Sequence, residues 1–454
     1  LAGQFEKADA QIGEMLGHVR SDLEKTDLLS LRMTLYASQG RFSDGVADGR
    51  AGLKLLGIDL PEGSQACMGA LMAEVASIGQ ILAGISIQSL VDAPLLTDKV
   101  QQSALRLLMG ITPRAFQVEP TLFALVVAKQ VLISLTHGNA NASAFAYVTY
   151  GLILAGSFGQ YAAAIELGRL ALQLVEKLGA IEVACKVNSA YAFFAPYGEP
   201  LRQSIAACAR AQQIGLETGD LYYASMAFIY LPLAMLRLGD PLESVLEEVV
   251  RGLSAMKRTK DETAIQAITL MQAVIACLQG QTTGPTSLDS RTFSETDWLA
   301  RVEALKIAGI KCLFYCFKSL LFTLHENSAQ ALAMAAEAES NQATATGLHY
   351  ATDVPFLSAL ALAREHDSAA ADKQPALRES IERNLAIMTK LKEGAPANEE
   401  HRHALICAEL ARVSDHFEQA QGHYEKAITT ARENGFPHHE ALAKKKKIFV
   451  IMVE

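Results

Sequence analysis

The stretch GLETGDLYYA, residues 215–224, predicts the fold of this chain. Gly219 can adopt the left-handed backbone conformation in which many α-helices end. Asp220, the next residue, is of a type that caps the start of a following helix with its carboxylate. We therefore expect one helix to end here, a two-residue turn to follow and a second helix to begin, which together make a helical hairpin.

Three other segments follow the same pattern. The clearest is 404–432, with a turn at Ser414-Asp415. Weaker copies occupy 147–178, with Gly159 in the turn, and 28–56, with Gly40 in the turn. The small or aromatic residues expected where helices meet are Ala408, Ala411, Ala420, Tyr424 and Ala427 in the first copy, Ala164 and Ala171 in the second, and Gly45 and Gly52 in the third.

In every copy two small residues lie seven positions apart, which is about two helical turns, so both face the same neighbouring helix. Tetratricopeptide repeats have this pattern. We therefore predict an all-α fold, an α-α superhelix that is a tetratricopeptide-like solenoid of antiparallel helical hairpins. Such stacks typically present binding surfaces.

Composition agrees with this fold class and excludes several functions. The chain has 454 residues, 50% hydrophobic and 7% aromatic. Its 40 basic and 49 acidic residues give a net charge of −9, and the only basic cluster is at the extreme C-terminus, so a nucleic-acid partner is not expected. Seven cysteines without disulfide-framework spacing and the lack of a signal peptide predict a cytoplasmic location.

No membrane partner is expected either. The most apolar stretch, 122–135, contains Lys129 and Gln130 and is too short to span a bilayer, so it predicts a buried helix. Cys312 and Cys316 share a helix face and are expected to be small buried hydrophobes rather than a metal or redox pair. The single tryptophan, Trp298, is expected to be a hydrophobic anchor.

The chain begins inside a repeat and without a methionine, which we interpret as a fragment of a longer protein. Breaks occur at 57–63, 92–94, 196–200, 280–290 and 393–396. The Gly280–Ser290 break predicts a joint between an N-terminal half, 1–280, and a C-terminal half, 291–443. Helices between the clear repeats are predicted at 65–91, 97–110, 121–137, 183–195, 201–218, 221–238, 241–256, 261–279, 295–324, 328–343, 352–366 and 375–393.

Residues 444–454 do not continue the repeat pattern. Four lysines, 444–447, precede the apolar run IFVIMV at 448–453. We interpret this segment as a non-repeat tail, either a scar or a cropped terminus, in which the helix that begins near His438 is abandoned. If exposed, the run would be prone to aggregation.

Several segments resemble, in order, the long helical-repeat region of large multidomain signalling proteins. These proteins carry an AAA-type, STAND-like ATPase, often behind a serine/threonine kinase-like domain, and frequently end in GAF and histidine-kinase modules. The resemblance covers roughly residues 20 to 443. The segments that carry it are 40–58, AIELGRLALQLVEKL at 164–178, Pro200-Leu201-Arg202 leading into GLETGDLYYASMA at 215–227, LQGQT at 278–282, Val354-Pro355-Phe356 leading into Ala359-Leu360, and ARENGF at 431–436 leading into 440–443.

No catalytic constellation is apparent in the sequence. It lacks the phosphate loop of nucleotide-binding enzymes, the His-Glu-x-x-His zinc motif and the Gly-x-Ser-x-Gly nucleophile elbow. The pairs His401/His403 and His438/His439 are expected to be solvated or capping residues. We therefore predict no enzymatic activity, no cofactor and no metal, and the ATPase and kinase activities of the resembling proteins lie outside this chain.

The candidate binding residues are a cluster of aromatics in a chain otherwise poor in them. They either line a groove for a peptide or small effector or fill a wide layer between helices. Arg202 supplies a charge to such a groove or is simply solvated. The groove candidates are Tyr191, Phe194, Tyr197, Arg202, Tyr222, Tyr223 and Tyr230.

These observations favour a non-catalytic sensor or scaffold arm of a multidomain signalling ATPase or kinase. Its concave face would bind a protein, a peptide or a small effector, or would dock the ATPase domain of the same protein. Two alternatives remain open. The solenoid is a spacer or a dimerisation platform without a ligand, or it is an enzyme built on an α/α scaffold.

Overall fold

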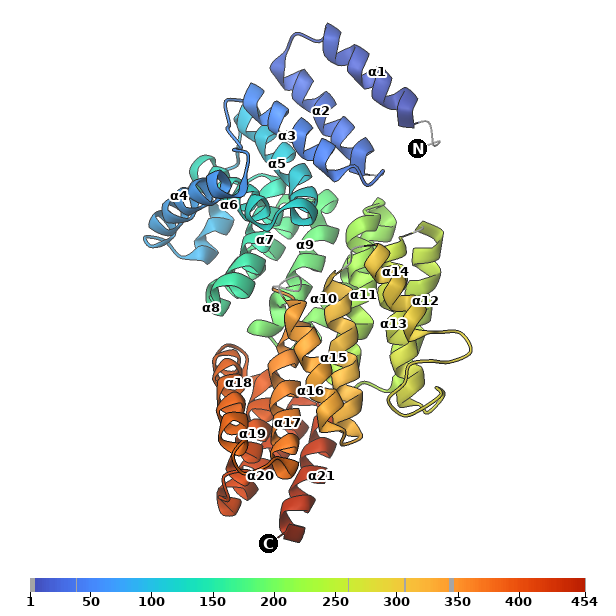
Figure 1. Cartoon of the computed structure of the whole chain (residues 1–454). Helices are drawn as coiled ribbons and strands as arrows, with labels where there is room; N and C mark the ends of the chain where they lie inside the picture. The colour runs from blue at the N-terminus through green and yellow to red at the C-terminus, as the bar shows by residue number, and fades with distance from the viewer. Residues whose placement is uncertain (1–4, 38, 260, 306–307, 343–346, 454) are drawn as a thin grey trace. The chain divides into compact units, whose positions relative to one another are not determined.

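The computed structural model describes residues 5–37, 39–259, 261–305, 308–342 and 347–453. Within these residues every regular element is a helix, and the only β-type pairing is an isolated bridge between Leu95 and Asn139. Most successive helices are joined by short turns and pair as antiparallel hairpins (Figure 1). The predicted all-α superhelical fold of helical hairpins is therefore confirmed.

Contacts between Cα atoms divide the chain into two compact units. Unit 1 comprises Leu1–Leu154 and Glu166–Val187, and unit 2 comprises Ala155–Ile165 and Asn188–Glu454. The loop at 280–290 lies inside unit 2, so this division differs from the one predicted at that loop. The loop is fastened to the helices that follow it, because Lys318 donates a hydrogen bond of 2.6 Å to the carbonyl of Thr286 and forms an ion pair of 2.7 Å with Glu295.

The helices of the first part of the chain contain two of the predicted repeats, 28–56 and 147–178. They are α1 (Phe5–His18), α2 (Asp22–Ala37), α3 (Phe42–Leu55), α4 (Ser64–Leu82), the 3-10 helix η1 (Ile87–Asp92), α5 (Lys99–Val118), α6 (Pro120–His137), α7 (Asn141–Phe158), α8 (Tyr161–Leu178) and α9 (Ile181–Phe194).

The rest of the chain continues the same hairpin arrangement. Its elements are η2 (Ala195–Tyr197), α10 (Leu201–Thr218), α11 (Leu221–Leu238), α12 (Leu242–Thr259), α13 (Glu262–Leu278), α14 (Glu295–Ala304), α15 (Ala308–Leu324), α16 (Ser328–Ser340), η4 (His349–Thr352), α17 (Asp353–Ser368), α18 (Gln374–Gly394), α19 (Pro396–Arg412), α20 (Phe417–Asn434) and α21 (Pro437–Val453).

The hairpin predicted at 215–224 forms with one difference in its cap. Gly219 ends α10 in the left-handed conformation, with φ 79°. Asp220 stands at the N-cap of α11, but its side chain makes no capping hydrogen bond to the first turn. Asp261 does make one, since its carboxylate accepts from the backbone N–H of Ala264. The turn therefore depends on the glycine and not on the expected carboxylate cap.

The three predicted repeat copies are α2–α3, α7–α8 and α19–α20. Their turns contain Gly40, Gly159 and Asp415, each with a positive φ. The residues expected at the tight helix contacts are all buried: Gly45, Gly52, Ala164, Ala171, Ala408, Ala411, Ala420, Tyr424 and Ala427.

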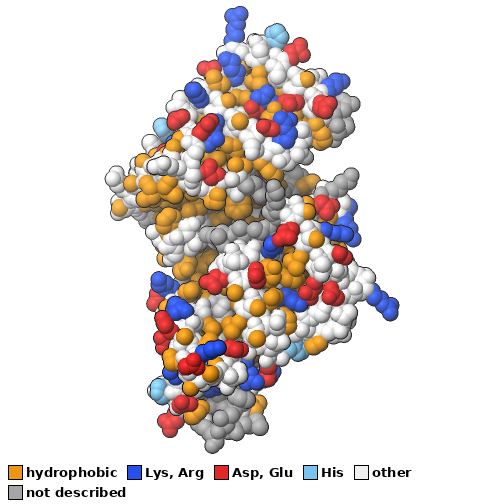
Figure 2. Space-filling view, viewed as in Figure 1, with side chains coloured by type: hydrophobic (Ala, Val, Ile, Leu, Met, Phe, Trp, Pro, Cys, Tyr) orange, Lys and Arg blue, Asp and Glu red, His pale blue; other side chains and the backbone are white. Residues whose placement is uncertain are grey.

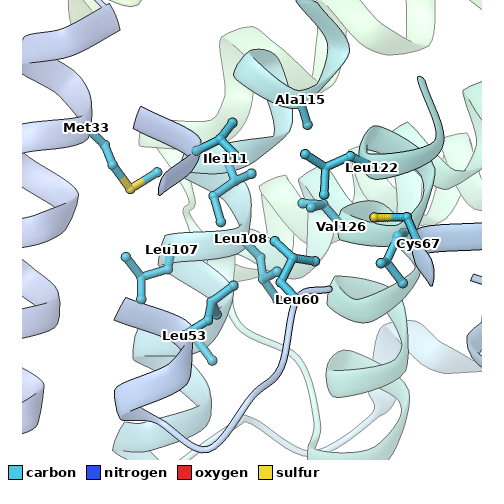
Figure 3. Close-up of a cluster of buried hydrophobic side chains, with 13 residues drawn as sticks. Met33, Leu53, Leu60, Cys67, Leu107, Leu108, Ile111, Ala115, Leu122 and Val126 are labelled. Carbon is cyan, nitrogen blue, oxygen red and sulfur yellow. The ribbon is translucent and has the colours of Figure 1, made fainter. Parts of the chain in front are cut away.

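The core of unit 1 shows why α3 carries glycines. An added Cβ on Gly49 would lie 2.4 Å from a carbon of Ile111, and one on Gly52 would lie 2.9 Å from a carbon of Leu107. The glycines let α3 lie directly on α5. Figure 3 shows Ile111 and Leu107 of α5 in the same cluster as Met33 of α2. The close approach of these backbones is what the small-residue pattern predicted.

Several helix boundaries differ from prediction. The helix predicted at 65–91 ends at Leu82, and the one predicted at 97–110 continues to Val118 with Pro113 inside it. The helix predicted at 295–324 is two helices, α14 and α15, with 306–307 outside the described residues. The end predicted at residue 343 also lies outside the described residues, and α16 ends at Ser340.

The expectation that a helix is abandoned at the lysines is wrong, because α21 continues through them to Val453. Two of the lysines have acidic partners, one in the turn between α15 and α16 and one on α19. Lys445 lies 3.0 Å from Glu326, and Lys446 lies 3.3 Å from the buried Glu409. These ion pairs hold the described part of the segment against the rest of unit 2 as a helix.

By length and composition, three described helices could cross a membrane: α4, α6 and α11. The expectation that the stretch within α6 is too short was wrong, since α6 has 18 residues. The helix α6 is nevertheless packed, because 44% of its 18-residue apolar segment is buried in the structure. The corresponding share is 56% for α11 and only 17% for α4. Met68 and Met72 of α4 are exposed, and Figure 2 shows hydrophobic surface where Figure 1 places this helix.

Candidate effector site

The principal cavity of unit 2 has a volume of about 450 Å³. It lies among α11, α12, α13, α15, α17, α19 and α21, so its walls come from helices far apart in the sequence (Figure 1). Most of its lining is apolar and includes Leu236, Leu313, Phe317, Leu320, Phe356 and Leu442. A volume of this size is typical of sites for small organic ligands.

One wall of the cavity is charged, and its centre is Arg237. This arginine lies near the end of α11, and its Nε and Nη2 donate to the two carboxylate oxygens of Asp353 at 3.1 and 2.8 Å. Nη2 also donates to the hydroxyl of Thr352 at 3.1 Å, and Nη1 lies 2.7 Å from Nδ1 of His349. This set of contacts fixes the guanidinium plane against η4 and the first turn of α17.

A second arginine, Arg402 of α19, completes the charged wall. Its Nη1 lies 2.9 Å from a carboxylate oxygen of Glu399, one turn earlier on the same helix. Its Nη2 donates to the carbonyl of Thr352 and to Asp353, each at 2.9 Å. The guanidinium carbon lies 4.6 Å from the ring centre of Phe356. Asp353 therefore bridges two arginines that belong to different hairpins.

The Nε of Arg402 is the exception among these donors. Arg402 is only 3% exposed, and its Nε is buried without a hydrogen-bond acceptor. A buried donor without an acceptor is costly, because it gave up its hydrogen bonds to water on folding. Arg402 is one of the residues that line the cavity.

The protonation states on this wall follow from burial and from the two arginines. Burial opposes ionisation of Glu399, but Arg402 and His349 outweigh it and lower the pKa of this carboxyl to about 2. Burial, together with the positive charge of Arg237, lowers the pKa of His349 to about 4. At neutral pH Glu399 is therefore ionised and His349 is neutral.

A histidine cluster adjoins this wall, where solvated or capping histidines were expected, and His439 itself lines the cavity. His401 is 1% exposed, its Nε2 lies 2.8 Å from Nδ1 of His439, and its ring stacks on Phe436 at 4.3 Å. Burial lowers the pKa of His401 to about 3 and the pKa of His439 well below its usual value. Both rings are therefore neutral packing groups at neutral pH, and for them the expectation was wrong.

The predicted aromatic residues are not gathered around this cavity. Tyr191, Phe194 and Tyr197 are buried. Tyr197 stacks on Tyr161 at 4.9 Å and meets the edge of His349 at 5.0 Å. Tyr197 thus supports the charged wall from behind, within the layer between helices.

Tyr230 packs nearby, with its ring 4.2 Å from that of Phe193 and 6.3 Å from that of Tyr350. All three rings line a hole of only about 20 Å³, little more than the space of one water molecule. Tyr191 and Phe194 form an edge-to-face pair with ring centres 5.7 Å apart. This layer is therefore packed shut.

The remaining candidates lie at the surface. Tyr222 and Tyr223 form an edge-to-face pair at the start of α11, and Tyr222 is 42% exposed. Arg202 is exposed in the first turn of α10. The structure thus brings Tyr197 and Tyr230 close to the charged wall, whereas Arg202, Tyr222 and Tyr223 are not among the residues that line the cavity.

The charged residues of the wall were missed by the sequence analysis. Arg237 carried a signal, since it is the only charged residue in the helix LYYASMAFIYLPLAMLRL. The sequence contained no such signal for Asp353 or Arg402, because each looks like an ordinary polar residue near the start of a helix. Among the residues that the structure describes, no group of three or more His, Cys, Asp or Glu side chains could hold a metal ion.

Three residues predicted to be packing groups are buried as expected. Cys312 and Cys316 are 0% and 4% exposed. Trp298 is 4% exposed, stacks on Phe314 of α15 at 5.3 Å, and donates from its ring nitrogen to the carbonyl of Gln266 in α13. It therefore anchors α14 between its two neighbours.

Comparisons with known proteins identify no family for this chain. No family model matches it, and no curated protein matches it. Among solved structures, it is similar to a Signal Transduction ATPase with Numerous Domains (STAND) protein with a tetratricopeptide repeat sensor from Pyrococcus horikoshii, with 11% identity and a TM-score of 0.38 over 96% of this chain. The chain spans 66% of the length of that structure. It is also similar to the P58(IPK) TPR domain, with 14% identity and a TM-score of 0.25 over 98% of this chain and 95% of the other.

Proposed function

We propose that this chain is a non-catalytic sensor region of a multidomain signalling ATPase or kinase, and that the cavity of unit 2 holds its effector. The observation that carries the proposal is the cavity itself, about 450 Å³ of mostly apolar space with one charged wall. The ordered resemblance of segments between residues 20 and 443 supports the signalling context. The cytoplasm and a protein, peptide or small-molecule partner fit this role.

The chemistry of the wall supports binding rather than catalysis. General acid–base catalysis needs a group whose pKa lies near the working pH. The pKa of Glu399 is held at about 2 and that of His349 at about 4, so neither group is poised to exchange a proton near neutral pH. Both arginines are held by carboxylates. The wall therefore orients a ligand more readily than it transforms one.

The position of the cavity suggests how binding would be transmitted. Its lining includes Leu236 of α11, Leu320 of α15 and Leu442 of α21, which belong to different hairpins. A ligand in contact with all three stabilises one packing of these hairpins over others. It shifts the population of signalling states only by its difference in affinity for them.

The proposal is tested in the full-length gene product by measuring ATPase or kinase output. Replacing Leu320 by tryptophan fills the cavity, whereas Leu31→Trp changes an exposed leucine of unit 1. We expect Leu320→Trp to change the regulation of output and to leave the unregulated rate intact, and Leu31→Trp to change neither. Equal behaviour of the two variants would favour a spacer or dimerisation platform, and a gene product without either activity would refute the signalling context.

A further inference from the structure

We propose that the unit 2 cavity binds a cationic amphiphile, an amine whose ammonium group pairs with Asp240 while its apolar body fills the interior. This inference rests on the proposed function, since it names the chemical class of the effector. It comes from an acidic side chain that has no partner and lines a mostly apolar cavity.

The acidic side chains of the lining outnumber its basic ones. The acidic lining residues are Asp240, Asp353 and Glu399, and the basic ones are Arg237 and Arg402. Asp353 accepts from both arginines, and Glu399 accepts from Arg402. Asp240 forms no ion pair and no side-chain hydrogen bond with any residue that the structure describes. One acidic side chain of the lining is therefore left without a basic partner.

The end of α11 separates Asp240 from the arginine closest to it in the sequence. Arg237 lies three positions earlier, but its Nε and Nη2 donate to the two carboxylate oxygens of Asp353. The helix ends at Leu238, and Gly239 follows in the left-handed conformation with φ 82°. Asp240 therefore lies outside the helix, in the turn before α12, while Arg237 is held by another carboxylate.

The histidines of the lining do not supply the missing positive charge. The ring of His438 packs on the backbone of Gly239, where an added Cβ would overlap it. This desolvation and the two arginines lower the pKa of His438 to about 4. Burial also lowers the pKa of His349 to about 4 and that of His439 well below its usual value. All three rings are neutral at neutral pH, so a cation that pairs with Asp240 has to come from outside the protein.

The surroundings of Asp240 favour a cation with an apolar body. Asp240 is half-buried and Pro241 beside it is exposed, whereas Val274, Leu313 and Phe317 of the lining are buried. An ammonium group next to Asp240 keeps part of its hydration, so it avoids the full cost of burying a charge. The attached chain leaves water for the apolar interior, which is favourable. An anionic head group would instead meet a side chain of its own charge.

The volume sets the size of the apolar body. A dry cavity of about 150 Å³ holds benzene, so by the same ratio about 450 Å³ has room for roughly eighteen carbon-sized atoms. A straight ten-carbon chain with one head group is within this limit and serves as the probe.

The experiment measures binding to the whole chain at pH 7 by isothermal titration calorimetry. The ligands are decylammonium, decan-1-ol and decanoate, each below the concentration at which it aggregates. We expect one decylammonium to bind per chain, about fivefold to tenfold more tightly than decanol, and decanoate to bind most weakly. Asp240→Asn should lower the affinity for the amine to that for the alcohol. Unchanged binding of decanol to this variant would show that it is folded.

Two further variants locate the effect. Glu243→Gln changes an exposed acid on α12 that does not line the cavity, and we expect it to alter none of the three affinities. Leu320→Trp fills the cavity and should weaken amine and alcohol alike by about tenfold or more. A preference for the amine that Asp240→Asn keeps, or that Glu243→Gln also removes, would overturn the proposal. Equal affinity of the unaltered chain for amine and alcohol would overturn it too, as would binding that Leu320→Trp does not weaken.

Failure of this inference can be told from failure of the proposed function. If none of the three compounds binds but Leu320→Trp still alters regulation of the full-length gene product, the ligand class is wrong and the sensor role stands. If decylammonium binds through Asp240 but Leu320→Trp leaves regulation unchanged, the ligand class stands and the sensor role is wrong. If neither occurs, both are wrong.

Discussion

Arg237 and Asp353 form a two-point ion pair between residues 116 positions apart in the sequence. Their side chains are only 13% and 25% exposed, and Asp353 also accepts from Arg402. One carboxylate therefore holds together α11, α17 and α19. This shared, partly buried anion makes the wall sensitive to single substitutions, because removing it leaves two guanidinium groups short of an acceptor.

Asp353→Asn is expected to lower the free energy of unfolding of unit 2 by about 3 kcal/mol or more. Urea unfolding followed by the fluorescence of Trp298, the only tryptophan, reports this unit directly. The control is Glu379→Gln, which breaks an ion pair with Arg383 on α18 whose partners are 71% and 64% exposed. It should change stability by less than about 0.5 kcal/mol. If Asp353→Asn lowers the free energy of unfolding by no more than Glu379→Gln does, Asp353 does not hold the three helices together.

Acid should destabilise unit 2 in two overlapping steps. The pKa of His349 is lowered to about 4 and that of His401 to about 3, so below the ordinary histidine pKa the unfolded chain binds protons that the folded chain does not. The two histidines make their full contribution to the free energy of unfolding above about pH 6.5. That contribution is lost as the pH falls through their pKa values in the folded chain. Glu399, with its pKa lowered to about 2, adds a loss below about pH 4.5.

The measurement is the urea midpoint of Trp298 fluorescence between pH 7 and pH 4. His349→Gln and His401→Gln should each flatten the decline, whereas His325→Gln, at an exposed position after α15, should leave it unchanged. A midpoint that is constant down to pH 4 would contradict the low histidine pKa values.

Gly49→Ala is expected to destabilise unit 1 by about 1–3 kcal/mol, because its methyl group would overlap Ile111. Gly69→Ala in α4 should have the opposite sign, with a gain of about 0.5–1 kcal/mol, since nothing lies within 4 Å of its added Cβ. Thermal unfolding followed by far-ultraviolet circular dichroism measures the stability of both variants. As a control, an unfolding transition of Trp298 fluorescence that does not change would show that unit 2 is unaffected. Stabilisation by both alanines would mean that α3 and α5 are not in close contact.

The turn conformations give a pair of substitutions with opposite expected effects. Gly219 has φ 79°, so Gly219→Ala forces a side chain into the left-handed region and should cost about 1–2 kcal/mol. Asp415 has φ 60°, so Asp415→Gly should relieve strain and be neutral or stabilising by up to about 1 kcal/mol. Both turns lie in unit 2, and urea midpoints compare them directly. The same sign for both would argue against one of the two turn conformations.

The sequence alone was sufficient to predict the helical hairpins, because their determinants are local. A left-handed glycine such as Gly219 acts within its own turn, and small residues seven apart, such as Gly45 and Gly52, mark a helix face that another helix approaches. Helix limits were less predictable where neighbours decide them. Pro113 is accommodated inside α5, and the lysines of α21 remain helical beside Glu326 and Glu409.

The candidate site was decided by the tertiary structure. The aromatic cluster was visible in the sequence, but whether its rings line a groove or fill a layer depends on the helices packed against them, and Tyr197 is packed between Tyr161 and His349. The wall of Arg237, Asp353, Glu399 and Arg402 is assembled from three helices. Local sequence patterns specify which residues a helix presents, whereas long-range packing specifies which of them meet, are buried together and acquire shifted pKa values.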